Sequence, residues 1–151
     1  MVLYNTDVID HINDNIFCEL RPSKIHGIGL FAIRDISIGT ELVKTWEGDS
    51  GVYKVPLFLI NPDIQPLLWR YFGISNKDSQ SMIKVIESEQ SLNVRLFKGV
   101  NFAYHPILFV NHSDSPNVDD NLKSIKTIKK DDEIVRCYYK KIIFSSDKTI
   151  L

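Results

Sequence analysis

The chain has 151 residues, of which 44% are hydrophobic and 11% aromatic, and its formal net charge is −1. This length fits one domain that buries a core of its own. The near-neutral charge argues against a strongly basic nucleic-acid-binding protein. No apolar run reaches the roughly 18–20 residues that span a bilayer, and residues 1–15 lack the apolar stretch of a secretory signal.

The cysteines and histidines do not show the spacings of a metal site. The cysteines lie far apart, which favours a reducing, intracellular compartment over a disulfide framework. HxH, HExxH and CxxC patterns are absent, so no metal site is expected. Phosphate-binding GxxxxGK[ST] loops and GxSxG nucleophile turns are absent as well. The residues concerned are Cys18, Cys137, His11, His26, His105 and His112.

Apolar patterns predict mainly strands in the first half of the chain. Strands are expected at 16–21, 28–33 and 41–46, with a turn at 37–40 and a loop at 48–51. A short amphipathic helix is predicted from Asp63, a candidate N-cap, to Phe72, with Gly73 ending it.

The second half contains two predicted strands around chemically unusual residues. Alternation predicts a strand at 92–97, whereas residues 76–90 are ambiguous. A continuous apolar strand at 107–110 runs into Asn111-His112-Ser113, where small polar side chains are unusual for a half-buried position. Two acidic groups follow, at 114–120 and 131–133, and they are interpreted either as solvated turns or as the edge of a groove that attracts basic peptides.

Two stretches of the chain resemble each other. Residues 32–46, AIRDISIGTELVKTW, align without gaps on residues 124–138, SIKTIKKDDEIVRCY. Each reads as an apolar strand, a polar turn and a second apolar strand that ends in an aromatic residue. Two copies are too few for a solenoid, so two similar β-units in one compact arrangement are expected, with a chance hairpin resemblance as the alternative.

Four motifs occur in a defined order. They are Gly27-x-Gly29, Ile36-x-x-Gly39-x-Glu41-Leu42 with Trp46-x-Gly48-Asp49, Phe109-x-Asn111-His112-Ser113-x-x-Pro116-Asn117, and Ile128 with Glu133-Ile134 and Tyr138. Their order and spacing resemble the SET domain, a lysine methyltransferase fold that uses S-adenosylmethionine. The likeness covers residues 16–140, and the NHSxxPN element is its most specific part.

The resemblance implies a mainly β fold, the β-clip, with several small curved sheets, a short helical insert and a C-terminal pseudoknot. Residues 1–15 would form an N-terminal extension and 16–140 the SET domain, with a variable insert at about 56–91. A tail at 141–151 would close the cofactor or substrate site. The zinc-binding modules that flank many SET domains are absent, and stand-alone proteins of this size are most familiar in viruses and prokaryotes.

The resemblance also implies roles for single residues. Tyr138 matches the active-site tyrosine, which would orient the lysine amine rather than act as a simple base, because a phenol of pKa near 10 is a poor base at neutral pH. Trp46, Phe109 and Arg136 would line the substrate channel. Cofactor contacts are expected from a larger set, namely Lys24, His26, Gly27, Ile28, Gly29, Asn111, His112, Tyr139 and Phe144.

The implied activity is transfer of a methyl group from S-adenosylmethionine to a lysine of a protein or peptide, histone-like in character, with S-adenosylhomocysteine as product. No membrane, nucleic acid or metal is expected as a partner, and a homodimer is left open. Several positions depart from the family pattern: Trp46, Asp49, Tyr104, His105, Leu108, Arg136 and Cys137. Trp46, Arg136 and Cys137 motivate one alternative, a SET-like module that binds cofactor or a partner without methylating it. A further alternative is methylation of a non-protein amine.

Overall fold

Strands in small sheets dominate the part of the chain that the computed structural model describes, residues 4–72, 91–101 and 109–138. Two short α-helices accompany them, so the mainly β fold class is confirmed. The chain divides into two units, here called the first unit (Met1–Phe17 and Val43–His105) and the second unit (Cys18–Leu42 and Pro106–Leu151).

The first unit opens with an unpredicted helix, α1 (Thr6–Asn15). Asn5 caps it by accepting a hydrogen bond from the Val8 amide at 3.1 Å, which satisfies one of the free N–H groups of the first turn. Buried side chains recur along one helix face at Val8, Ile9, His11 and Ile12. The prediction treated this segment only as an extension, although its apolar residues have helical spacing.

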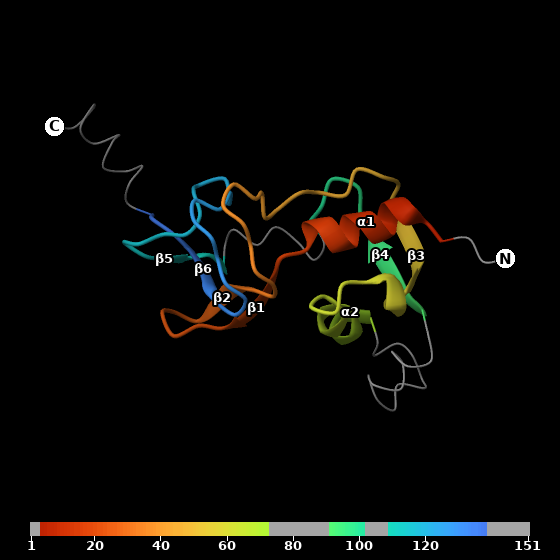
Figure 1. Cartoon of the computed structure of the whole chain (residues 1–151), viewed down its shortest axis with the longest axis horizontal. Coiled ribbons are helices and arrows are strands. Elements are labelled where there is room, and N and C mark those ends of the chain that lie inside the picture. The colour runs from red at the N-terminus through yellow and green to blue at the C-terminus, as the bar shows by residue number, and fades with distance from the viewer. Residues whose placement is uncertain (1–3, 73–90, 102–108, 139–151) are drawn as a thin grey trace. The chain divides into compact units, whose positions relative to one another are not determined.

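A two-stranded sheet completes the first unit, with α1 beside its strand β3 (Figure 1). Strand β3 (Gly51–Pro56) pairs antiparallel with β4 (Ser91–Leu96), and the 3-10 turn η1 (Leu57–Leu59) and helix α2 (Gln65–Phe72) follow β3. Strand β4 and helix α2 agree with the predicted elements. Strand β3 was not predicted.

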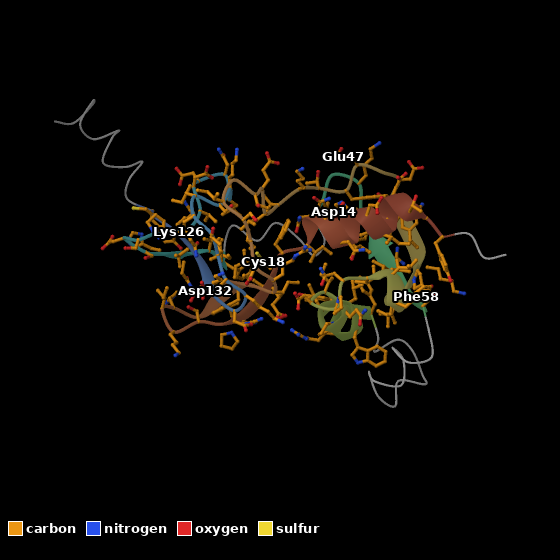
Figure 2. All side chains as sticks on the ribbon, viewed as in Figure 1. Asp14, Cys18, Glu47, Phe58, Lys126 and Asp132 are labelled. Carbon is orange, nitrogen blue, oxygen red and sulfur yellow. The ribbon has the colours of Figure 1, made fainter. Side chains whose placement is uncertain are left out.

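The second unit is a four-stranded sheet in the order β1-β2-β6-β5 (Figure 1). Its strands are β1 (Cys18–Pro22), β2 (Ile28–Ala32), β5 (Asn111–His112) and β6 (Glu133–Arg136). The predicted strands at 16–21 and 28–33 correspond to β1 and β2. Burial raises the pKa of the Cys18 thiol at the start of β1 (Figure 2), which disfavours the reactive thiolate.

Two other strand predictions were wrong in detail. Residues 41–46 form no strand, because regular pairing there is limited to one bridge between Glu41 and Lys123. Phe109 and Val110 are also outside any strand, and the strand begins only at Asn111. The remainder of the predicted strand, residues 107 and 108, lies outside the described residues.

The two similar stretches pair with each other around a local two-fold axis. Ile36 and Ile128, which occupy equivalent positions in the two copies, exchange both backbone hydrogen bonds, at 2.7 and 2.9 Å. On one side the Ala32 amide donates to the Asp132 carbonyl, and on the other the Ser124 amide donates to the Thr40 carbonyl, both at 2.9 Å. These two bonds also join equivalent positions. The two similar stretches therefore pair with each other, although residues 41–46 do not form the second strand expected in the first copy.

The symmetry extends to the backbone conformation of the turns. Gly39 has φ +85°, and its equivalent in the second copy, Asp131, has φ +75°. Both amides donate at 2.8 Å to the other copy, Gly39 to the Ser124 carbonyl and Asp131 to the Ala32 carbonyl. The turn therefore requires a backbone conformation with positive φ, the left-handed region, which glycine adopts without steric cost.

We expect Gly39→Ala to lower the free energy of unfolding by about 1 kcal/mol, because a Cβ is strained at positive φ. A Cβ at Gly39 would meet no atom within 4 Å, so the cost comes from the backbone alone. Gly51→Ala in β3 is the matched control, since φ is not positive there, and it should change stability by less than about 0.5 kcal/mol. Urea denaturation measures both, and equal effects would contradict the explanation.

A buried histidine links helix α1 to the loop before β3. His11 is 8% exposed and packs edge-on against Trp46, with ring centroids 5.2 Å apart. The Asn15 amide donates to its Nδ1 at 3.1 Å, so the neutral ring carries its proton on Nε2, which has no hydrogen-bond partner among the described residues. Burial lowers the pKa of His11, and the nearby Glu47 carboxylate opposes this shift more weakly.

A lowered folded-state pKa means that the unfolded chain binds the His11 proton more readily than the folded chain does. The stabilising contribution is thus present above the unfolded pKa of about 6.5 and is lost as the pH falls below it. His11→Asn keeps an acceptor for Asn15 but does not titrate, so its free energy of unfolding should fall less on acidification than that of the wild type. Identical slopes for the two proteins would contradict the assignment.

Candidate functional site in the second unit

The predicted NHS segment lies directly on the closing strand. Strand β5 pairs in parallel with β6, with Asn111 opposite Val135 and His112 opposite Arg136. The Ser113 amide then donates to the Arg136 carbonyl at 3.0 Å. Parallel pairing needs a connection of about a dozen residues or more, because the chain must return to the same end of the sheet.

Asn117 secures the same strand with its side chain. Its Nδ2 donates to the Glu133 carbonyl at 2.9 Å, and its Oδ1 accepts from the Val135 amide at 2.9 Å. Both backbone groups belong to β6, where Val135 is buried. The amide side chain therefore bonds β6 as a neighbouring strand would, which gives the Asn of the NHSxxPN motif a structural reason.

Asn111 projects from β5 toward the loop between β1 and β2. The side chain is buried, and its Nδ2 lies 2.8 Å from Glu133 Oε2, 3.1 Å from Ser23 Oγ and 3.1 Å from the His26 carbonyl. Three acceptors around one NH₂ group fix the orientation of the amide, because the reverse orientation would place its oxygen against the carboxylate. Asn111 thus joins the third motif to the β1–β2 loop and to Glu133 of the fourth motif.

The loop that carries several of the predicted cofactor contacts is closed on itself. The Ser23 amide donates to the Gly27 carbonyl at 2.8 Å. Gly27 has φ +47°, and a Cβ added to it would meet no atom within 4 Å. Lys24, His26 and Ile28 are exposed. The backbone around Gly27 is therefore accessible for close approach by a ligand.

Gly29 has a different role in the structure from Gly27. It is buried, and a Cβ on it would come within 2.9 Å of Glu133 Cδ and 3.1 Å of Ser23 Cβ. The space beside Gly29 is thus occupied by a side chain of the protein itself. A glycine is required at this position so that the Glu133 carboxylate can reach Ser23 and Asn111.

Tyr138 lies against the NHS segment. Its hydroxyl donates to the Val110 carbonyl, and its backbone amide donates to His112 Nδ1 at 3.0 Å. The ring centroids of Tyr138 and His112 lie 5.3 Å apart. Because His112 Nδ1 accepts a hydrogen bond, Nε2 of the neutral ring carries the proton and donates to Asp114 at 3.0 Å.

Arg136 covers one face of Tyr138. Its guanidinium carbon lies 4.7 Å from the centre of the tyrosine ring, a cation–π distance, and Nη1 lies 3.4 Å from Asp120 Oδ1. Its Nε is buried without a hydrogen-bond partner among the described residues. The guanidinium is thus held beside the tyrosine.

The remaining predicted site residues are Trp46, Phe109, Tyr139 and Phe144. Trp46 belongs to the first unit, where its indole N–H donates to the Asp49 carbonyl at 2.9 Å and its ring folds over Gly48. Phe109 is half-buried next to Val110. Tyr139 and Phe144, predicted to contact the cofactor, lie outside the described residues. The role of each in a cofactor site or channel remains a prediction.

Two contributors to the site, Ser23 and Glu133, were not among the predicted site residues. Glu133 was recognised only as part of a motif, and nothing about Ser23 distinguished it from an ordinary turn serine after Pro22. Their contact joins residues 110 positions apart. Periodicity within a single stretch of chain cannot reveal a pair of this kind.

Comparisons with known proteins leave the family open. No family model matches the chain, and no curated protein matches it. One solved structure that is similar is described as a "putative histone methyltransferase" of Plasmodium falciparum. It has a TM-score of 0.35 and 20% identity, over 82% of this chain and 94% of that one. A likeness of this strength assigns neither a family nor an activity.

Metal clusters and membrane-spanning helices are both absent from the described part of the chain. Among residues 4–72, 91–101 and 109–138, no group of three or more His, Cys, Asp or Glu side chains is placed to hold a metal ion. None of the described helices has the length and apolar character needed to cross a bilayer.

We expect Asn117→Ala to lower the free energy of unfolding by about 2–3 kcal/mol, because it removes two hydrogen bonds to β6 and leaves the amide of the buried Val135 unpaired. Asn121→Ala is the control. Asn121 is exposed, and among the described residues only its backbone amide is hydrogen-bonded, to Asp119. The substitution should therefore lower the free energy of unfolding by no more than about 0.5 kcal/mol. Chemical denaturation compares the two, and a similar small loss for both variants would refute the role given to Asn117.

Proposed function

We propose that the chain is a SET-type methyltransferase that transfers a methyl group from S-adenosylmethionine to a lysine amine of a protein or peptide. One observation carries the proposal. The Tyr138 hydroxyl is bonded to the Val110 carbonyl, directly before Asn111, whose amide reaches the Ser23–Gly27 loop. The proposed amine-orienting group and the proposed cofactor contacts therefore meet at consecutive positions along one segment.

The residues present fit the cofactor on chemical grounds. The methionine part of S-adenosylmethionine carries an ammonium group, which requires hydrogen-bond acceptors. Asn111 Nδ2 is used within the protein, whereas its Oδ1 has no hydrogen-bond partner among the described residues and is open to accept. The accessible backbone at Gly27 adds room for close contact. When bound, S-adenosylmethionine would supply an electrophilic methyl group on a sulfonium sulfur.

Tyr138 would act by orienting the lysine amine. Because its O–H is donated to the Val110 carbonyl, the hydroxyl would meet the amine as an acceptor of an N–H. That hydrogen bond would direct the nitrogen lone pair, and methyl transfer requires the nitrogen within about 3–3.5 Å of the methyl carbon and in line with it. The amine must also be neutral. Removal from water, together with nearby positive charge, lowers the pKa of a lysine from about 10.4.

Arg136 supplies positive charge in this proposal. Its guanidinium lies over the Tyr138 ring, where it would disfavour a protonated lysine approaching the same hydroxyl. It also occupies volume beside the tyrosine that an aromatic residue often fills in the family.

The test has two stages. Isothermal titration with S-adenosylmethionine and S-adenosylhomocysteine should detect binding, and transfer of a labelled methyl group to basic proteins, histones included, should follow. No binding at millimolar cofactor would overturn the proposal. Binding without transfer to any protein would favour a cofactor-binding module, and transfer to a small amine alone would favour methylation of a non-protein amine.

We expect Tyr138→Phe to lower the methyl-transfer rate at least about a hundredfold while the cofactor Kd changes less than about twofold, because the lost hydroxyl orients the amine rather than the cofactor. Tyr53→Phe is a matched control, since that hydroxyl also donates to a backbone carbonyl, of Asp49, and it should keep the wild-type rate. Single-turnover kinetics measures both. An unchanged rate in Tyr138→Phe would remove the tyrosine from the mechanism.

A further inference from the structure

Glu133, the first residue of β6, is placed to hold two partners at once. Its carboxylate accepts from the Ser23 hydroxyl, which lies 2.8 Å from Oε1 and 2.9 Å from Oε2. The same carboxylate accepts from Asn111 Nδ2 at 2.8 Å. Hydrogen bonds to a charged acceptor are stronger than neutral ones, so this carboxylate contributes more to the local geometry than the neutral acceptors beside it.

Ser23 transmits this arrangement to the β1–β2 loop. Its Oγ accepts from the Ile25 amide at 3.0 Å and from the His26 amide at 3.4 Å while its hydrogen is donated to Glu133. The loop backbone and the Asn111 side chain are therefore fixed by the same carboxylate. Gly29 makes this possible, because a side chain there would meet Glu133.

The geometry points to Glu133 and Ser23 as positioning residues for the proposed cofactor site. They hold the Asn111 amide with its nitrogen toward the protein, so that its oxygen faces the ammonium group of the cofactor. The inference rests on the proposed function and extends it, because it assigns a role in cofactor binding to two residues that would not touch the cofactor themselves.

The main test is the affinity of the full chain for S-adenosylhomocysteine, measured by isothermal titration. Glu133→Gln keeps the size of the side chain but presents an NH₂ group to either Ser23 or Asn111, which frees the Asn111 amide to turn over. We expect the Kd to rise about tenfold to a hundredfold. Ser23→Ala should change it in the same direction.

Asp132→Asn is the charge-matched control. Asp132 directly precedes β6 (Figure 2), and among the described residues its carboxylate accepts only a long 3.3 Å hydrogen bond, from the exposed Lys129 amide. The substitution removes the same negative charge one residue away from Glu133. Its Kd should stay within about twofold of the wild type. An increase equal to that of Glu133→Gln would show a general effect of charge and overturn the inference.

A double-mutant cycle separates positioning from a general structural role. If Glu133 acts through Asn111, then Glu133→Gln should weaken binding much less in an Asn111→Ala background than in the wild type. Additive losses would contradict the inference. Circular dichroism spectra and urea midpoints of each variant show whether it is folded, and Ser23→Ala, the smaller change, decides the outcome if Glu133→Gln does not fold.

The outcomes distinguish this inference from the proposed function. If the wild-type chain does not bind S-adenosylhomocysteine, the proposed function fails, and this inference fails with it. If the wild type binds and Glu133→Gln binds within about twofold of it, the inference alone is wrong. Binding by the wild type, loss in Glu133→Gln and retention in Asp132→Asn would support both.

Discussion

The parallel contact between β5 and β6 is the interaction on which the second unit depends. Strand β5 has only two residues, Asn111 and His112, which is too few for a ladder to be stable by itself. The adjoining residues add what the ladder lacks. Two residues that follow β5 also bond the backbone of β6, Ser113 through its amide and Asn117 through its side chain. Asn111 bonds the side chain of Glu133, the first residue of β6. The polar residues after Val110 thus replace strand length with side-chain hydrogen bonds.

This contact also determines which distant residues meet. Pairing of Asn111 with Val135 places the Asn111 side chain near Glu133, and pairing of His112 with Arg136 places its ring near Tyr138. The local two-fold axis through Ile36 and Ile128 then fixes where β6 begins relative to β2. A change of one residue in either register would turn these side chains to the opposite face of the sheet.

Local pattern predicted the parts of the fold that are regular. Apolar periodicity located β1, β2, β4 and α2, and the internal similarity identified two stretches that the structure joins through the Ile36–Ile128 bonds. Apolar periodicity gave a wrong prediction at residues 41–46, where an apolar stretch makes a single β-bridge before the chain passes into the first unit. Helix α1 was missed because its polar residues outnumber the buried ones on its single apolar face.

The candidate site was predicted from motifs rather than from local pattern. The motifs that contain Asn111 and Tyr138 are specific enough to identify residues that the structure brings together, although 26 positions separate His112 from the Tyr138 amide that donates to it. Ser23 could not be found in this way, since its importance comes from one carboxylate that reaches it across the sheet. Trp46 was identified from its position in a motif. The motif did not predict the contacts that its ring makes with His11 and Tyr53 in the first unit.

The central claim is that the Ser23–Gly29 loop, the NHS segment and the end of β6 form one cofactor site. Backbone amide chemical shifts of the isotope-labelled chain, recorded during titration with S-adenosylhomocysteine, test it most directly. The account predicts that the largest changes among the described residues fall at 23–29, 111–113 and 135–138, while helix α1 and strand β3 change little. Saturating changes confined to the first unit, or no changes at millimolar ligand, would contradict it.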